Sequence, residues 1–360
     1  MFIKYDSNTT PQKQGYIPAL DGIRAIAILL VLFAHSVIFD QFTWLRSIGF
    51  QLGLFGVSIF FVLSGYLITR LLIQEEEQTG NISLKFFYIR RAFRLLPALY
   101  LYLFVVWVLW IMGLLPDNPW HSFISSLLYI RNLIGRGDAT NHIWSLSFEQ
   151  QFYFLWPITI TLFRQQNIRR LVIAFILILT VVVWRCYAIT NNLATYGDVY
   201  IRTDFRLDSP LIGCAIAIIE KIKPRLIIRF NSSPFRSDML LITAIMLMIC
   251  WMTIQLQIGI VWSIDSTITS LIAGIVVISQ IVHYDSFGKR FLTLPPLIFI
   301  GKISYGLYLW QGLFLGLQVG AFGVMRKFPI DLILSFSSAL ISYFFLEKRL
   351  LKIKDKKFHK

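Results

Sequence analysis

Among the ionisable residues that lie within long apolar stretches of this 360-residue sequence, three stand out: Arg24, His35 and Glu149. Because ionisable groups are costly inside a bilayer, each of them is a candidate functional residue. Arg24 and His35 are eleven residues apart in the segment YIPALDGIRAIAILLVLFAHS. In a helix this separation is roughly 16 Å along the axis and close to three full turns, so both side chains project from one side. The alternatives are a snorkelling anchor for Arg24 and a hydrogen bond across a helix interface for His35.

Glu149 lies in NHIWSLSFEQQFYFLWP, near the outer end of an apolar stretch that runs opposite to the first. We therefore expect Glu149 at the same depth as His35. A histidine and a carboxylate at one depth could serve as a general base and the group that orients it. In the alternative interpretation, Glu149 faces the outer headgroups within an aromatic interface belt of Trp144, Phe148, Phe152, Tyr153 and Trp156.

A cluster of arginines precedes the third apolar stretch, in LKFFYIRRAFRLLP. Arg91 and Arg94 are three residues apart and Arg90 and Arg94 are four apart, so in a helix we expect the three guanidinium groups to converge on one face. Guanidinium groups bind phosphate well. The alternative is the ordinary positive charge of a cytoplasmic loop. The nearby acidic run 75–77 is predicted to be a solvated loop face.

Together these residues outline a path through the membrane. Cationic groups would lie at the cytoplasmic face, with His35 and Glu149 roughly one pantetheine arm deeper. Such an arrangement would suit a phosphate-bearing thioester donor that is held on the inside, with its acyl end presented near the outer half of the membrane.

The elements that must position these residues are predicted to be membrane-spanning helices. The chain is 56% hydrophobic and 15% charged, with a mean hydropathy of +0.67, whereas soluble domains have about 25% charged residues. Runs of the roughly 20 apolar residues needed to cross a bilayer recur along nearly the whole chain. We predict an all-α polytopic membrane bundle of about ten spans, at 20–39, 53–73, 95–115, 146–163, 171–189, 207–221, 239–257, 267–284, 295–319 and 330–347. Residues 123–133 are predicted to form a short interfacial or re-entrant helix.

The organisation is predicted to be a single integral membrane domain over residues 1–360. It begins with a polar segment, 1–19, that leads into an uncleaved first span, and it ends in a basic tail, 348–360, with no further domain. The three cysteines, at 186, 214 and 250, are scattered within apolar runs, which predicts neither a disulfide framework nor a metal site.

The net charge of +15 is explained by topology. Among alternate connections between the predicted spans, the set that includes both termini holds 24 Lys and Arg residues and the other set holds 7. Cytoplasmic connections carry the excess of positive charge, so both termini are predicted to be cytoplasmic and the number of spans even. No nucleic-acid partner is expected.

In its motifs the sequence resembles acyltransferase family 3, membrane proteins that include bacterial O-antigen and other polysaccharide O-acetylases. The resemblance covers essentially the entire chain. It is carried, in order, by LDGIRAIAILLVLFAHS, FGVSIFFVLSGYLIT, EEEQTGNISLKFFYIRRAFRLLPALY, IWSLSFEQQFYFLWP, RTDFRLDSPLIGCAIA, ISYGLYLWQ and SYFFLEKRLLK.

The resemblance implies an O-acyltransferase of the bacterial plasma (inner) membrane. The donor would be cytoplasmic acyl-CoA, commonly acetyl-CoA, with no permanently bound cofactor. The acceptor would be a hydroxyl of an envelope glycan such as lipopolysaccharide O-antigen, capsule or exopolysaccharide. His35 would be the base or a transient acyl carrier, with Glu149 as its catalytic partner.

The same motifs imply two further groups of residues. The donor-binding residues would be Arg24, Arg90, Arg91 and Arg94. The residues that bind the acceptor or support the site would be Asp21, Trp144, Ser145, Ser147, Tyr153, Arg206 and Asp208.

Three positions depart from the family pattern. Gln311 stands in YLWQ where many members have His, so a second catalytic imidazole is not expected there. Glu149–Gln150 replaces a frequent acidic pair, and Glu347–Lys348–Arg349 lacks the usual proline.

Two other functional classes are compatible with a polytopic bundle. A transporter or flippase of a lipid-linked glycan would also have buried polar groups, but it would move the acceptor without covalent change. A non-catalytic scaffold would leave the intramembrane Arg, His and Glu residues unexplained.

Overall fold

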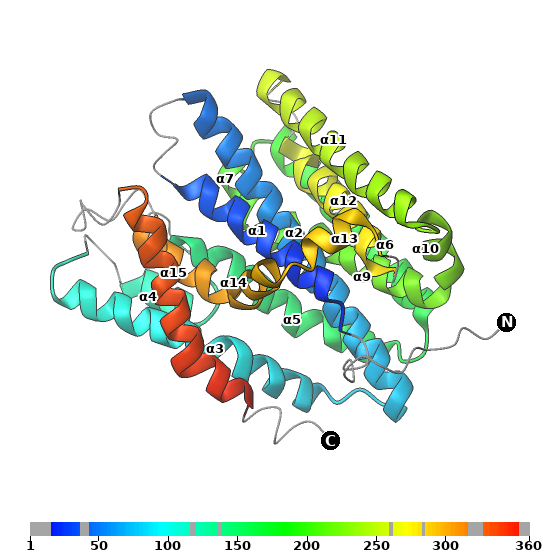
Figure 1. Cartoon of the computed structure of the whole chain (residues 1–360), viewed down its shortest axis with the longest axis horizontal. Helices are drawn as coiled ribbons and strands as arrows, with labels where there is room; N and C mark the ends of the chain where they lie inside the picture. Colours follow the sequence, from blue (N-terminus) through cyan, green and yellow to red (C-terminus); the bar gives the residue numbers. More distant parts are fainter. Residues whose placement is uncertain are drawn as a thin grey trace.

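The computed structural model describes residues 16–36, 43–115, 120–134, 139–258, 262–282, 285–315 and 327–352. Within these ranges every regular element is helical (Figure 1). In chain order the α-helices are α1 Pro18–His35, α2 Thr43–Thr79, α3 Leu84–Ile111, α4 Trp120–Leu127, α5 Trp144–Leu162, α6 Asn167–Thr190, α7 Tyr196–Ile201, α8 Thr203–Arg206, α9 Asp208–Ile222, α10 Pro224–Phe230, α11 Pro234–Ile258, α12 Trp262–Ile281, α13 Phe287–Leu292, α14 Pro295–Phe314 and α15 Ile330–Ser342. A 3-10 turn, Asn141–Ile143, precedes α5, and a π-helical turn, Tyr343–Glu347, follows α15.

Among the described residues, seven helical segments are long and apolar enough to cross a membrane: α1, α2, α3, α6, α11, α12 and the continuous helical stretch Ile330–Lys352 that begins with α15. The chain is therefore a multi-pass integral membrane protein. Helices α5, α9 and α14 coincide with the other three predicted spans. Helix α9 has only 15 residues, which is short for a complete crossing.

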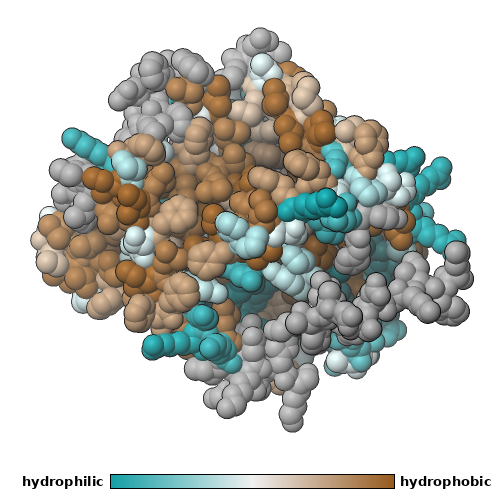
Figure 2. Space-filling view, viewed as in Figure 1, coloured by the Kyte–Doolittle hydropathy of each residue, from teal (hydrophilic) through white to brown (hydrophobic). Residues whose placement is uncertain are grey.

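The surface of the bundle is suited to lipid. Figure 2 shows a face dominated by hydrophobic residues over its upper left part, with hydrophilic residues gathered over its lower and right-hand parts. Large apolar side chains are exposed along α6 and α11, among them Phe175, Ile176, Leu179, Ile245 and Met246. Apolar surface of this extent is typical of contact with a hydrophobic phase rather than with water.

The central helices pack with their backbones almost in contact. A Cβ atom on Gly213 of α9 would lie 2.0 Å from the carbonyl oxygen of Val62 on α2, and one on Gly301 of α14 would lie 1.9 Å from that of Asp21 on α1. Small residues permit such close approach between membrane helices. These contacts fix the relative levels of residues on neighbouring helices.

The prediction that the acidic run at 75–77 is a solvated loop face is wrong. Helix α2 continues past the predicted span to Thr79, so the three carboxylates lie on a helix and are not a solvated loop face. Glu76 is 5% exposed and its two oxygens each lie 2.8 Å from a guanidinium nitrogen of the fully buried Arg170. In order, the three glutamates pair with Arg90, Arg170 and Lys221.

The segment before α5 is folded into the bundle. The predicted helix at 123–133 is shorter and earlier than expected, since α4 spans Trp120–Leu127 and turns follow it. Arg131 is 1% exposed and donates from Nε to Thr140 Oγ1 at 3.0 Å. Asn132 donates to Thr203 Oγ1 at 2.8 Å. As a result α5 begins inside the protein, and its first five residues are all buried.

Candidate active site

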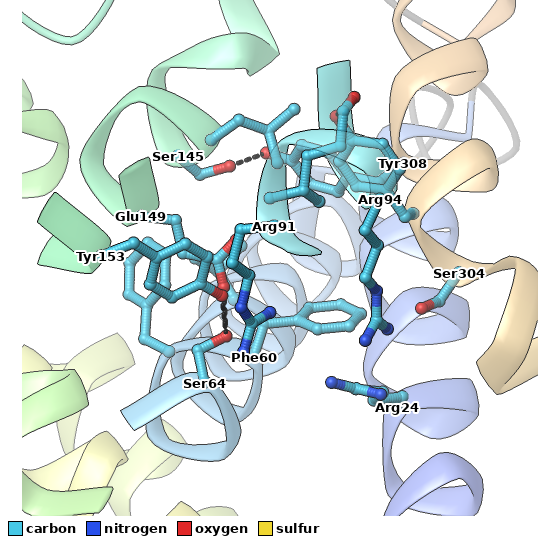
Figure 3. A pocket seen from close by; sticks show the side chains of 15 residues that line it. Arg24, Phe60, Ser64, Arg91, Arg94, Ser145, Glu149, Tyr153, Ser304 and Tyr308 are labelled. Carbon is cyan, nitrogen blue, oxygen red and sulfur yellow. Dashed lines mark hydrogen bonds between the residues drawn. The ribbon is translucent and has the colours of Figure 1, made fainter. Parts of the chain in front are cut away.

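Five helices, α1, α2, α3, α5 and α14, enclose a cavity (Figure 3). The space between its walls, including the open mouth, is about 630 Å³. It is lined by Arg24, Val57, Phe60, Phe61, Ser64, Arg91, Arg94, Leu95, Ser145, Leu146, Glu149, Tyr153, Ser304, Tyr305 and Tyr308.

One part of the cavity carries three guanidinium groups. Arg24 Nη1 lies 3.3 Å from Asp21 Oδ1, and Arg91 Cζ lies 4.8 Å from the centroid of the Tyr153 ring. Arg94 extends from α3 toward Arg24 on α1 (Figure 3). Within the part of the chain that the structure describes, neither Arg91 nor Arg94 has a carboxylate at ion-pair distance. Arg91 and Arg94 therefore keep guanidinium groups that can bind an anion.

Glu149 lies on the α5 wall of the same cavity, at one end of a short chain of hydroxyl groups. Its carboxylate accepts a hydrogen bond from Ser64 Oγ, and the Tyr153 hydroxyl donates to Ser64 Oγ at 2.9 Å. Ser64 and Tyr153 therefore fix the carboxylate in the cavity wall near Arg91. The cavity retains an excess of positive charge, because Asp21 and Glu149 face three arginines.

A second pair of hydroxyl groups lines the cavity where α5 begins. Ser145 Oγ is hydrogen-bonded to the Tyr308 hydroxyl, which in turn donates to the main-chain oxygen of His142 at 2.8 Å (Figure 3). Such hydroxyl groups can hydrogen-bond a carbonyl or hydroxyl group of a ligand.

Arg90 does not join the other arginines, so the prediction that all three guanidinium groups converge is wrong. Its Nη2 lies 2.7 Å from Glu75 Oε2, and it is absent from the cavity lining. Successive helical residues point about 100° apart, so Arg90 projects toward the end of α2 while Arg91 and Arg94 reach the cavity.

His35 does not line the cavity, and the expectation that Glu149 lies at its depth is also wrong. Gly53 of α2 packs against Ala34, next to His35. Ser64, the partner of Glu149, is eleven residues further along α2, or about 16 Å away along the axis. Glu149 instead shares the cavity with Arg24. The reason is the folded-in segment before α5, which places the start of that helix inside the bundle.

An apolar layer separates His35 from the cavity. Every residue of α1 between Arg24 and His35 is apolar, and Ile28, Val31 and Leu32 are at most 2% exposed. His35 Nδ1 lies 2.8 Å from the Val31 carbonyl oxygen. The structure thus brings Arg24, the two inward arginines of α3 and Glu149 together, and holds His35 beyond this layer.

A comparison of the sequence with known protein families shows to which family the chain belongs. The family model described as an acyltransferase domain matches residues 17–347. This chain belongs to acyltransferase family 3. The match includes every helix that lines the cavity, and it confirms the resemblance drawn from the motifs.

Curated relatives of this family 3 chain are named as O-acetyltransferases. A putative O-acetyltransferase of Staphylococcus aureus (strain COL) is 32% identical over 94% of this chain and 58% of its own length. The putative peptidoglycan O-acetyltransferase YrhL of Bacillus subtilis (strain 168) is 32% identical over 94% of this chain and 55% of its own length. The peptidoglycan O-acetyltransferase OatA of Listeria monocytogenes is 30% identical over 84% of this chain and 50% of its own length.

The chain therefore spans little more than half the length of these family 3 relatives. No solved structure matches the chain.

The remaining predicted site residues of this family 3 chain make contacts within the protein. Asp208 Oδ2 lies 3.1 Å from Arg185 Nη2, and both side chains are fully buried. Arg206 donates to Ser58 Oγ at 3.2 Å, and Ser147 Oγ accepts from the main-chain N–H of Arg131 at 3.2 Å. These residues brace the helices around the cavity.

The aromatic residues around Glu149 do not form an interface belt. Trp144, Phe148, Phe152, Tyr153 and Trp156 are each at most 7% exposed. The Trp144 ring packs against Tyr200, with centroids 4.8 Å apart. They belong to the interior of the family 3 domain, because they lie on the buried face of α5.

Several cavity residues were not predicted, notably Ser64, Ser304 and Tyr308. They lie in FGVSIFFVLSGYLIT and ISYGLYLWQ, which carry the family resemblance but few ionisable groups. Serine and tyrosine are ordinary residues of membrane helices, so their types alone gave no signal. The spacing of four residues between Ser304 and Tyr308 would have placed both on one face of α14.

Proposed function

We propose that this chain is a membrane O-acyltransferase that moves an acyl group, most simply acetyl, from cytoplasmic acyl-CoA to a hydroxyl of an envelope glycan. The proposal rests above all on one observation. Arg91 and Arg94 extend into a cavity without carboxylate partners among the described residues, which suits the phosphate groups of coenzyme A.

The transfer itself needs a nucleophile, a base and a leaving group. The oxygen of the acceptor hydroxyl attacks the thioester carbonyl carbon, and a new C–O bond replaces the C–S bond. The hydroxyl proton passes to His35 and then to the sulfur of the departing coenzyme A, so that charge and atoms balance. In a two-step variant, the His35 imidazole first attacks the thioester, so that a C–N bond replaces the C–S bond. The acceptor hydroxyl then displaces the imidazole, which takes up the hydroxyl proton.

The distance along α1 is compatible with phosphate binding at Arg24 and acyl transfer at His35. Arg24 and His35 are eleven residues apart, which corresponds to roughly 16 Å, similar to the length of a pantetheine arm. Glu149 then lies at the phosphate end of the path. There its carboxylate limits the positive charge of the arginine site and is held by Ser64 and Tyr153.

The acceptor is proposed from the relatives. Two of them are named for peptidoglycan O-acetylation, so a glycan of the cell envelope is the proposed acceptor class, with lipopolysaccharide O-antigen, capsule and exopolysaccharide as the other members of the test panel. The proposed setting is the bacterial inner membrane, with ten spans and both termini in the cytoplasm.

The test is acyl transfer by the purified protein in nanodiscs, using acetyl-CoA labelled in the acetyl group and a panel of envelope glycans that includes peptidoglycan fragments. Label on a glycan, formed with the wild type and not with empty nanodiscs, is the expected result. Movement of unmodified lipid-linked glycan across vesicles, without acyl-CoA and without label transfer, would overturn the proposal in favour of a transporter or flippase.

A further inference from the structure

Gln311 is a buried amide without a partner, just beyond the cavity. Its side chain is 1% exposed, and among the described residues neither Oε1 nor Nε2 has a hydrogen-bond partner. A buried carboxamide that makes no hydrogen bonds is destabilising, so a residue of this kind needs a compensating role. Neither the catalytic pair nor the arginine site uses it.

The position of Gln311 on α14 directs it along the proposed path. Ser304 and Tyr308 line the cavity, and Gln311 lies seven and three residues beyond them. These spacings place all three side chains on one side of the helix. A ligand that extends from the cavity beyond Tyr308 therefore meets Gln311 one turn later.

The packing of α14 against α1 relates this residue to His35. Gly301 contacts the backbone of Asp21. Counting ten residues along each helix from that contact leads to Gln311 and Val31, and Val31 shares an apolar cluster with Leu307 and Trp310. Gln311 thus lies at about the same level of the bundle as the α1 stretch that separates Arg24 from His35, next to Gly312, whose backbone closely approaches His142.

The residues near Gln311 indicate which kind of chemical group it binds. Residues 25–34 of α1 are all apolar, so a polar group that crosses this layer finds no partner there. A carboxamide offers one donor and one acceptor in a plane, which matches another amide. In an acyl-CoA, the segment between the phosphates and the thioester is the pantetheine arm, and it contains two amides.

We infer that Gln311 binds an amide of the pantetheine arm and positions the thioester toward His35; this rests on the proposed function. The arm reaches Gln311 by displacing apolar side chains such as Ile28 and Val31, which are at most 1% exposed. Binding of the nucleotide end requires no such displacement. The inference therefore predicts that a change at Gln311 affects binding of the pantetheine arm and not binding of the nucleotide.

The experiment compares two ligands on three forms of the protein. Coenzyme A carries the arm, whereas 3′-phosphoadenosine 5′-diphosphate has the phosphates without it. Gln311→Met keeps the approximate volume and removes the hydrogen-bonding groups. Gln280→Met is the matched control, because Gln280 on α12 is also fully buried with an unpartnered Oε1 within the described structure, and it is absent from the cavity lining.

Binding is measured by calorimetry in nanodiscs. We expect Gln311→Met to raise the Kd for coenzyme A about tenfold, the effect of losing an amide's hydrogen bonds, and to leave that for 3′-phosphoadenosine 5′-diphosphate within about twofold. Gln280→Met should change neither. Retained nucleotide binding shows that Gln311→Met is folded.

Equal affinity of Gln311→Met and the wild type for coenzyme A would overturn the inference while leaving the proposed function intact. Failure of the wild type to bind either ligand would instead remove the donor itself, and the inference with it.

Discussion

At the scale of single residues, Arg90, Arg91 and Arg94 show how direction on a helix decides function. All three are arginines on the first turns of α3, yet Arg90 pairs with Glu75 while the other two line the cavity. Glu149 shares that cavity, and His35 lies beyond an apolar layer. In the proposed mechanism, donor binding and acyl transfer therefore belong to different residues, which can be changed separately.

Replacing His35 by alanine is expected to abolish transfer and spare donor binding. Loss of a general base lowers turnover by roughly 10²–10⁴-fold. The Kd for coenzyme A should stay within about twofold of the wild type, since His35 is separated from the arginines. His121→Ala, at an exposed residue of α4, is the control, and both quantities are measured in nanodiscs. Normal turnover by correctly inserted His35→Ala protein would refute the role of His35.

Glu149→Gln tests whether this carboxylate acts in donor binding or in acyl transfer. Glutamine can still accept the hydrogen bond from Ser64, but it removes a negative charge from a cavity that binds phosphates. We expect affinity for coenzyme A to be unchanged or a few-fold tighter, and turnover to stay within about tenfold of the wild type, because Glu149 lies at the phosphate end of the path. A fall in turnover of about 100-fold or more would contradict this and give Glu149 a direct part in proton transfer. Glu220→Gln, at a carboxylate that accepts from Tyr66 at 2.8 Å and is absent from the cavity lining, is the control. Wild-type turnover in Glu149→Gln would exclude a catalytic carboxylate.

At the scale of elements, each of the ten predicted spans coincides with a helical segment in the described residues. In a membrane, an apolar run of this length has to satisfy its own backbone hydrogen bonds, and a helix does so. The errors concern helix ends and depth. Helices α2 and α3 extend through the charged stretch 74–94, except for 80–83, since Glu, Lys and Arg end an apolar run but favour helix. The depth of α5 depends on how residues 120–134 and 139–143 pack into the bundle, and the hydropathy of α5 contains no information on that packing.

The close helix crossing between α2 and α9 leads to a prediction on stability. Alanine at Gly213 places a Cβ atom 2.0 Å from the Val62 carbonyl oxygen, whereas alanine at Gly274 first meets the flexible end of Ile216 at 3.1 Å. We expect Gly213→Ala to destabilise the protein by about 1–3 kcal/mol and Gly274→Ala to be nearly neutral. Thermal unfolding in one detergent measures both. Equal midpoints for the two variants would contradict the close approach of α2 and α9.

At the scale of the whole molecule, connections predicted to share one side of the membrane come together. The carboxylates at the end of α2 pair with Arg90, Arg170 and Lys221, which belong to three different predicted cytoplasmic connections. This clustering agrees with the alternation of charge along the chain. The direction of insertion itself stays a prediction from the excess of Lys and Arg.

Thiol labelling tests that direction. In a variant without the three native cysteines, Asn192→Cys should react with a membrane-impermeant maleimide in intact cells, because it lies in an exposed connection of the less basic set. Gln78→Cys, exposed at the end of α2, should react only after the membrane is permeabilised. The reverse pattern would place the arginine cavity on the wrong side for a cytoplasmic donor.

The central claim, that the arginines of this cavity hold the phosphates of the donor, is tested most directly by coenzyme A binding to Arg94→Ala and Arg90→Ala in nanodiscs. Removing a charge-assisted hydrogen bond typically costs about 1.5–3 kcal/mol, so we predict that Arg94→Ala raises the Kd at least tenfold. Arg90→Ala should leave it within about twofold, because Arg90 faces Glu75. Equal affinities for the two variants, or no binding by the wild type, would contradict the account.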